Sequence, residues 1–334
     1  MEAPITNLVV TAIVTTYDRP EQCKRALRSV RAQTYEPLEV IVVEDGTETD
    51  VQSWLDAEFP AADYIRHADN RGLAAARNTG LERASGEWVA YLDDDDEWKP
   101  ERVKSQVAEL QSLSPERLPE VGVVYCGVEC QNSGGAVLWT SDPDNSGELR
   151  SSIQEIGAST LPSTFLFSRG ALLDVGGFDE SLPSSIDHDI WMSLATGGYH
   201  AITVDEPLVI TYQTDQASMV TDTYPRIKGV EQYVRKWTPT YQEWYGVEEG
   251  IRYRDRYFTR VIARVVDEKI RRGNYKEAWD AIRAIFRVID RDQYRESAHF
   301  LKRTIFKAMR VRAGKRLPQP IVRILGWMRR MIGA

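Results

Sequence analysis

Four consecutive aspartates, Asp93 to Asp96, follow an uninterrupted apolar run from Trp88 to Leu92. A run of this length, bounded by Gly86 and by charge, predicts a short strand that is covered on both faces. The carboxylates then lie at the carboxyl end of the strand, which is the edge where ligands bind in open α/β sheets. Clustered carboxylate oxygens there suit Mg²⁺ or Mn²⁺ holding a phosphate. The alternative is a solvated acidic turn that caps the next helix, which begins near Pro100.

Two further pairs of acidic residues have positions suited to chemistry. Glu44 and Asp45 follow a predicted strand, Leu38 to Val43, and therefore stand at the same kind of strand end. Asp187 and Asp189 open a predicted helix, because apolar residues follow at helical spacing: Ile190, Trp191, Leu194 and Ala195. The helix dipole favours anions at this end, so these two acids either cap the helix or serve a reaction.

The elements that must position these carboxylates alternate between strands and helices. Strands are predicted at Leu8–Thr15, Leu38–Val43, Asp63–His67 and Trp88–Leu92, and helices at Glu21–Gln33, around Trp54–Phe59 and within Asn70–Gly86. This alternation predicts a parallel sheet with right-handed crossovers. Later elements are a helix at Glu101–Leu113, strands at Val121–Glu129, Thr164–Ser168 and Ala201–Tyr212, and a hairpin across Gly134 and Gly135. Neither GxGxxG nor GxxxxGK[ST] occurs, so side chains and metal must hold any phosphate.

Three segments carry a resemblance to a known family. They are IVTTYDRPEQCKRALRSVRAQTYEPLEVIVVEDG, NRGLAAARNTGLERASGEWVAYLDDDDEW and GGFDESLPSSIDHDIWMSLATGGY, in this order. Together they resemble the family 2 glycosyltransferases over roughly Leu8 to Tyr212. The resemblance implies an α/β fold of the Rossmann-like GT-A type, with a mixed, mainly parallel sheet flanked by helices. It also implies inverting transfer from a nucleotide sugar.

For the nucleotide, the resemblance implies that the loop after the first strand, including Thr15 and Tyr17, wraps the base and ribose. Asp45 then accepts a hydrogen bond from the base N–H, and Arg71 contacts the base or a phosphate. Arg77 either serves the diphosphate or forms a salt bridge inside the fold. Glu44 stands where many relatives have a second aspartate, and this departure leaves Asp45 in place.

The tetrad matches the DxD-like metal motif of the family. Four consecutive aspartates leave the register of this motif open; we favour Asp95 as the metal ligand, with Asp93 or Asp94 reaching the ribose or a metal-bound water. The cation would be Mg²⁺ or Mn²⁺ and would stabilise charge on the departing diphosphate.

The acidic pattern that supplies the catalytic base in the family falls on Asp187. This chain has Ile186 where the family often has Glu or Gln, and His188 lies between the two acids. His188 and Asp189 therefore remain alternatives for the base.

Charge and composition divide the chain. Net charge is −8, but the residues from Arg295 onward carry +10, so the rest carries −18. An acidic body excludes nucleic acid as a partner, whereas a basic tail attracts anionic membranes. We expect residues 1–213 to form the catalytic domain, 214–294 a helical extension with breaks near Pro239, Gly250 and Gly273, and 295–334 a basic amphipathic tail. Residues 214–225 suggest a linker or active-site flap.

The tail shows an apolar stripe at helical spacing that includes Ile321, Ile324 and Met328, with arginines elsewhere around the helix. Such a helix binds in a membrane interface, or docks on the body of the protein itself. No apolar run reaches the roughly 20 residues that span a bilayer. Three cysteines without a paired framework, and a start without a signal peptide, indicate a reducing cytoplasm.

The sequence thus predicts a metal-dependent, inverting glycosyltransferase at the cytoplasmic face of a membrane. The donor is a nucleoside-diphosphate sugar, with UDP-sugars favoured. The acceptor is a lipid-linked or polysaccharide glycan, in protein N-glycosylation or surface polysaccharide assembly. The alternatives are a nucleotidyltransferase, which usually has a Gly-rich basic loop after the first strand, and a non-catalytic nucleotide-sugar-binding module.

Overall fold

The structure of this protein is a computed structural model that describes residues 8–46, 51–143, 146–154, 161–213, 222–310 and 317–332. The chain forms two compact units. The sheet unit comprises Met1–Ser181 and Ile186–Asp215, and the helical unit comprises Leu182–Ser185 and Gln216–Ala334. Residues 214–221, which belong to the predicted flap, lie outside the described residues, as do 311–316 of the tail.

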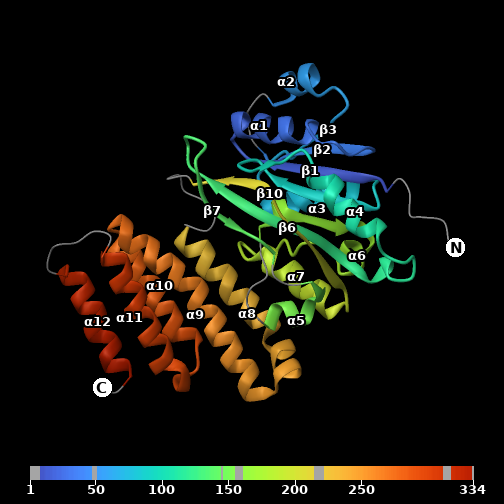
Figure 1. The fold of residues 1–334 in the computed structure, drawn as a ribbon. Coiled ribbons are helices and arrows are strands. Elements are labelled where there is room, and N and C mark those ends of the chain that lie inside the picture. The colour runs from blue at the N-terminus through green and yellow to red at the C-terminus, as the bar shows by residue number, and fades with distance from the viewer. Residues whose placement is uncertain are drawn as a thin grey trace. The chain divides into compact units, whose positions relative to one another are not determined.

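The sheet unit is built on one mixed sheet, in which the described residues form ten strands (Figure 1). The strand order is β3-β2-β1-β4-β9-β6-β10-β5, while β7 pairs with β6 and β8 pairs with β10. The strands are β1 (Val10–Thr16), β2 (Leu38–Glu44), β3 (Asp63–Arg66), β4 (Trp88–Asp93), β5 (Glu97–Trp98), β6 (Val121–Gln131), β7 (Val137–Ser141), β8 (Gly147–Glu148), β9 (Phe165–Ser168) and β10 (His200–Tyr212).

The first four long strands are parallel, as the sequence predicts. Strand β1 pairs with β2 and with β4 in register, so that Thr16 lies beside Glu44 and Thr15 beside Asp93. The carboxyl ends of three strands therefore meet at one edge of the sheet. Strand β9 runs antiparallel between β4 and β6. Among the described strands, four pairings are parallel and five are antiparallel, so the sheet is mixed, with helices flanking it.

Helices of the sheet unit are α1 (Pro20–Arg31), α2 (Val51–Glu58), α3 (Leu73–Arg83), α4 (Arg102–Gln111), α5 (Leu149–Gln154), α6 (Arg169–Asp174) and α7 (Ile186–Thr196). Helix α3 packs tightly because its buried face is made of small residues. A methyl group at Gly80 would lie 2.4 Å from Cγ2 of Ile13 on β1. This close approach brings Arg77, one turn earlier on α3, into the core near the strand ends.

The helical unit contains α8 (Thr223–Tyr245), α9 (Val247–Arg272), α10 (Tyr275–Val288), α11 (Tyr294–Arg310) and α12 (Gln319–Met331). Two predicted helix breaks are wrong: α8 continues through Pro239 and α9 through Gly250. A methyl group at Gly250 would lie 2.6 Å from the backbone of Tyr241, so this glycine permits close packing of α9 on α8. The third predicted break, near Gly273, is confirmed, because α9 ends there, while α8 ends at Gly246; both glycines have positive φ.

The apolar stripe of the tail is docked within the helical unit. Ile321, Ile324 and Met328 are buried on α12, which contacts α10 and α11. The ring of Trp327 meets the rings of Trp279 and Phe286 edge-on, at 4.9 and 5.3 Å between centroids. Of the two uses that the sequence allows for this stripe, the structure shows the docked one. No described helix is both long and apolar enough to cross a bilayer.

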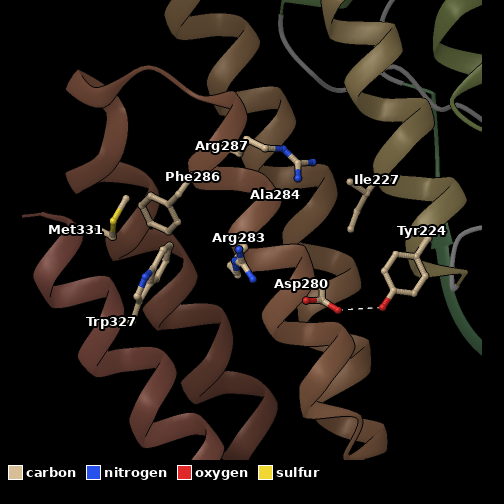
Figure 2. Close-up of a pocket in the computed structure, with 9 residues that line it drawn as sticks. All are labelled: Tyr224, Ile227, Asp280, Arg283, Ala284, Phe286, Arg287, Trp327 and Met331. Atoms are coloured by element: carbon tan, nitrogen blue, oxygen red, sulfur yellow. Dashed lines mark hydrogen bonds between the residues drawn. The ribbon is translucent and has the colours of Figure 1, made fainter.

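A cavity of about 570 Å³ opens where α12 closes over α8 and α10 (Figure 2). Its lining mixes aromatic and charged side chains: Tyr224, Ile227, Asp280, Arg283, Ala284, Phe286, Arg287, Trp327 and Met331. The Tyr224 hydroxyl donates to Asp280 across 2.9 Å. None of the site residues predicted from the sequence lines this cavity.

Candidate active site

The four aspartates form a turn in which alternate side chains face opposite ways. The backbone N–H of Asp96 donates to the carbonyl of Asp93 across 3.0 Å, which closes the turn between β4 and β5. Asp94 and Asp96 are buried. Asp93 and Asp95 keep side-chain exposures of 23% and 45%. Only one pair of the tetrad is therefore open to a ligand.

The buried pair holds the turn in place. Asp94 accepts from the Thr16 hydroxyl at 2.8 Å and pairs with Arg19 at 2.7 Å. Asp96 accepts from the Ser163 hydroxyl at 2.6 Å. Burial raises the pKa of Asp94 to about 7 and that of Asp96 to about 8. Asp94, predicted to reach the nucleotide, instead fastens β4 to the end of β1 in this structure.

Arg77 joins the tetrad to the candidate base. Its guanidinium is fully buried and donates to Asp93 across 2.8 Å and to Asp187 across 2.6 Å. Burial acts to lower the pKa of Arg77, but the two carboxylates outweigh this effect and raise that pKa above its ordinary value. Of the two roles that the sequence allowed for Arg77, the structure shows the salt bridge inside the fold.

Asp187 lies in the first turn of α7, and its side chain is 26% exposed. Asp189, the alternative acid, is buried. His188 is partly exposed, in the same turn. The structure therefore brings Asp93, Asp95 and Asp187 toward one side of the sheet edge, with Arg77 between two of them and Arg19 against Asp95 at 3.1 Å.

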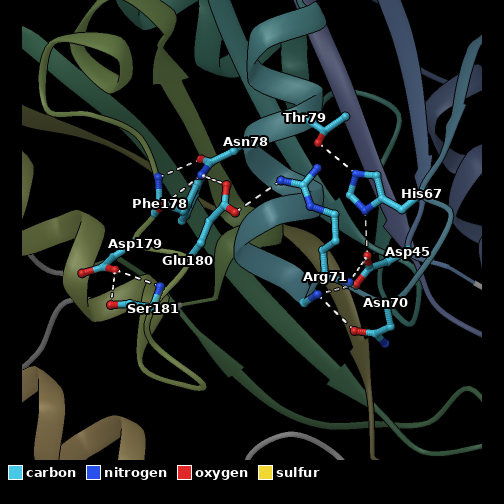
Figure 3. Close-up of polar contacts among 11 residues, drawn as sticks. Asp45, His67, Asn70, Arg71, Asn78, Thr79, Phe178, Asp179, Glu180 and Ser181 are labelled. Carbon is cyan, nitrogen blue, oxygen red and sulfur yellow. Dashed lines mark hydrogen bonds and ion pairs between the residues drawn. The ribbon is translucent and has the colours of Figure 1, made fainter.

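Asp45 shapes the loop that leads into α3 (Figure 3). One of its carboxylate oxygens bonds His67 Nδ1 at 2.7 Å and accepts from the Arg71 backbone N–H at 2.9 Å, and the other accepts from the Gly72 N–H at 2.8 Å. His67 Nε2 lies 2.9 Å from the Thr79 hydroxyl, which fits a tautomer with the proton on Nδ1. Asp45 is buried, so most of its bonding capacity is already used by the protein.

The remaining predicted nucleotide residues lie around the same edge. Thr15 is buried at the end of β1, and Tyr17 is half exposed in the turn that follows. The Arg71 side chain points outward and pairs with Glu180 at 3.4 Å, as Figure 3 shows. Sequence reasoning missed Arg19 and His67. Arg19 is the N-cap residue of α1 and His67 follows β3, and the acids that they contact are distant in the sequence.

A divalent cation could bind here if the protein carboxylates and the phosphates of the substrate coordinate it together. Among the described residues no three His, Cys, Asp or Glu side chains converge to enclose a metal. The accessible oxygens are those of Asp93 and Asp95, which are hard donors. Mg²⁺ is commonly bound by one or two carboxylates together with substrate phosphates, and this pair matches that arrangement.

The sequence comparisons decide the class of protein. Residues 11–165 match the model described as Glycosyl transferase family 2. These residues are a family 2 glycosyltransferase domain. An uncharacterized glycosyltransferase of Haemophilus influenzae is 27% identical over 234 residues, covering 68% of this chain and 76% of that protein. The glucosyl-dolichyl phosphate glucuronosyltransferase of Haloferax volcanii is 30% identical over 177 residues, covering 51% of this chain and 56% of that protein.

Solved structures agree on the fold of this glycosyltransferase. TarS of S. aureus in complex with UDP-GlcNAc superposes with a TM-score of 0.63 at 15% identity, covering 91% of this chain and 90% of TarS. The mannosyltransferase PcManGT from Pyrobaculum calidifontis, in complex with GDP-Man and Mn²⁺, gives 0.54 at 20% identity, covering 99% and 87%. At these identities the likeness establishes the GT-A fold alone, and it extends over the C-terminal helices.

Proposed function

We propose that this glycosyltransferase moves a sugar, with inversion, from a nucleoside-diphosphate sugar to a hydroxyl group of a lipid-linked or polysaccharide glycan. One observation carries the proposal: the buried guanidinium of Arg77 donates to Asp187 from one terminal nitrogen and to Asp93 from the other. Asp187 is the candidate base, and Asp93 lies at the strand end where the diphosphate would bind.

The donor would bind along the carboxyl ends of β1, β2 and β4. Thr15 and Tyr17 border the base and ribose, while Asp45 sets the loop through which Arg71 reaches the nucleotide. In this proposal Asp95 is the cation ligand and Asp93 shares it or contacts the ribose. Mg²⁺ or Mn²⁺, when bound there, would offset charge on the leaving diphosphate. Asp94 contacts neither the cation nor the nucleotide in this proposal, but stabilises the turn between β4 and β5 through Thr16 and Arg19.

The base would be Asp187, because it is the acid of α7 that remains partly open to solvent. It would take the proton of the acceptor hydroxyl while that oxygen attacks the anomeric carbon. The bond to the diphosphate breaks on the opposite face, so a single displacement inverts the configuration and needs no enzyme nucleophile. Arg77 donates to the Asp187 carboxylate and orients it.

The relatives support a choice of donor and of acceptor. TarS binds UDP-GlcNAc and PcManGT binds GDP-Man, and we favour a UDP-sugar for this chain. The name of the Haloferax volcanii relative includes a dolichyl phosphate, which supports a lipid-linked acceptor. For such an acceptor we propose that the enzyme works in the cytoplasm, peripheral on the inner face of the cell membrane.

The membrane contact would use the outer faces of α11 and α12 rather than the docked stripe. Exposed basic residues on these faces alternate with exposed apolar ones: Phe300, Lys302, Arg303, Phe306, Lys307, Val322, Arg323, Arg329 and Arg330. Each basic residue close to an anionic surface contributes about 1 kcal/mol. Flotation with phosphatidylglycerol vesicles tests this contact. Changing Lys302, Arg303 and Lys307 to Gln should weaken binding about 100-fold, since about 3 kcal/mol is lost.

The matched control for flotation removes three charges from α9, by changing Arg252, Arg260 and Arg264 to Gln. This variant should bind nearly as well as the wild type. Equal weakening in both variants would show that net charge, and not this face, governs binding. Equal flotation of the wild type with neutral phosphatidylcholine would remove the electrostatic basis of the proposal.

Release of nucleoside diphosphate tests the catalytic proposal. Wild type, Asp187→Asn and Asp174→Asn are incubated with a panel of UDP- and GDP-sugars, with and without Mg²⁺ or Mn²⁺, in the presence of membrane lipid extract. Asp174 is a control acid on α6 that accepts from the Tyr199 hydroxyl at 3.0 Å. We expect metal-dependent turnover with one donor, reduced about 10²- to 10⁴-fold in Asp187→Asn alone. Full activity of Asp187→Asn would show that another group is the base. Turnover without added metal would show that the reaction needs no divalent cation.

A further inference from the structure

The chain leaves the sheet unit for four residues immediately before α7. The segment Leu182–Ser185 packs with the helical unit, although the residues on either side of it belong to the sheet unit. Asp187 follows only two residues after this segment ends. Only Ile186 separates the segment from Asp187 along the chain.

Helix α8 holds this segment through its own backbone. The Ser184 hydroxyl lies within hydrogen-bond distance of the carbonyls of Pro225 and Arg226, at 3.4 and 3.3 Å. A methyl group at Gly229, one turn further along α8, would lie 2.2 Å from Ser184 Oγ, 2.7 Å from its backbone N and 2.8 Å from its backbone O. Only glycine permits this contact, since ordinary carbon contacts begin near 3.4 Å.

The supporting end of α8 is itself fixed. The Thr223 hydroxyl donates to Glu277, and the Tyr224 hydroxyl donates to Asp280 across 2.9 Å. Both acids lie on α10. The first turn of α8 is thus tied to a second helix before it meets Ser184, so it forms a rigid support.

Ser185 turns the chain into α7 in a conformation that serine rarely adopts. Its φ is +67°, in the left-handed region, and its hydroxyl is buried with no hydrogen-bond partner among the described residues. Such a residue persists only where its surroundings impose the conformation. The contacts of α8 with Ser184, the residue before it, restrict the backbone conformation of Ser185.

We propose that Ser184 and Gly229 are positioning residues for Asp187: the helical unit holds the segment Leu182–Ser185, and the segment sets the first turn of α7. This inference rests on the proposed role of Asp187 as the base. A methyl group at Gly229 must push Ser184 away by on the order of 1 Å, and a misplacement of this size costs about 10²-fold in rate. Donor binding uses strand ends that this displacement leaves in place.

The test compares Gly229→Ala with Gly250→Ala. Both changes insert a methyl group against backbone atoms of the helical unit, 2.7 Å from the Ser184 nitrogen for Gly229 and 2.6 Å from the Tyr241 carbonyl for Gly250. Both should lower the melting temperature. We expect only Gly229→Ala to reduce kcat, by about 10- to 100-fold, with the KM of the donor unchanged within about twofold. Because Gly229 acts through Asp187, the double variant with Asp187→Asn should be no slower than Asp187→Asn alone.

A second readout does not depend on turnover. Hydrogen exchange of the peptide covering residues 186–192 should accelerate in Gly229→Ala and stay at the wild-type rate in Gly250→Ala. If the wild type releases diphosphate from no donor, the proposed function fails, and the exchange experiment still tests the positioning. Ser184→Ala, a milder change, takes the place of Gly229→Ala if that variant does not fold. Equal loss of kcat in both glycine variants, or unchanged exchange in α7, would overturn the inference.

Discussion

Two arginines are completely buried in the sheet unit, and their contrasting surroundings give a stringent test of the site. Arg77 faces two carboxylates, whereas Arg102 has no acidic partner among the described residues. Arg102 stacks on Trp98 at 4.0 Å and donates to the Phe165 carbonyl at 2.7 Å. Burial lowers the pKa of Arg102 to about 10. We predict that Arg77→Met strongly destabilises the sheet unit and that Arg102→Met does not.

The magnitude follows from what each change leaves behind. Removing one member of a buried ion pair typically costs about 3–5 kcal/mol, because the other charge stays buried. The two acids left by Arg77→Met are 23% and 26% exposed and keep part of their hydration, so we expect about 2–4 kcal/mol. Arg102→Met loses a hydrogen bond and a ring contact but also removes the desolvation of a buried cation. Its net effect should stay within about 1 kcal/mol.

Differential scanning calorimetry at pH 7 measures the effect on each unfolding transition. A cost of about 2–4 kcal/mol should lower the melting temperature of the sheet unit by about 5–15 °C. Adding Asp93→Asn to Arg77→Met should recover part of the loss, since one uncompensated charge is removed. The reasoning is refuted if Arg77→Met is as stable as Arg102→Met, or if the second change brings no recovery.

Three further predictions concern other contacts. His67→Ala should cost about 1–3 kcal/mol, because it takes one of three hydrogen-bond partners from the buried Asp45 carboxylate, and should weaken UDP binding; thermal denaturation and titration with UDP measure the two effects. Gly46→Ala should destabilise the protein by more than about 2 kcal/mol, because φ is +75° and the new methyl group would lie 2.2 Å from the backbone of Asp69 and Asn70. Gly135→Ala, at φ +79° with no atom within 4 Å, should cost only about 1 kcal/mol. Chemical denaturation measures both. Ile324→Asp should release α12 to proteolysis, while Val322→Asp on its exposed face should leave it protected.

The sheet edge could be predicted because each strand carries its own signal. The apolar run Trp88–Leu92 is β4 almost residue for residue, and the acids follow where its apolar character stops. Parallel pairing then brings such ends together by geometry alone, since every strand of a parallel set finishes at the same edge. Asp45 and Asp93 could for this reason be placed near each other without knowledge of any contact.

The division of labour within the tetrad could not be predicted. Four identical residues give no indication of which side chains turn inward, because that depends on the turn between β4 and β5. The partners that bury Asp94 and Asp96 come from distant parts of the chain, at Thr16, Arg19 and Ser163. The sequence does not predict the salt bridge between Arg77 and Asp187 either, since 110 residues separate the two.

The wrong prediction at Gly250 has a related physical reason. The sequence predicts a break there because glycine weakens an isolated helix. In the folded unit the missing side chain is what lets α9 approach Tyr241, so tertiary packing outweighs the local preference. Gly229 has the same property on α8, where the close neighbour is Ser184.

Asp187 is therefore constrained from two directions that have different physical origins. Arg77 acts electrostatically on the carboxylate itself, and the contact between Gly229 and Ser184 acts sterically on the backbone just before it. An electrostatic hold alone would let the first turn of α7 follow the arginine, and a steric hold alone would leave the carboxylate free to rotate. Together they would fix both the position and the orientation of the group, as the proposed role of Asp187 as the base requires.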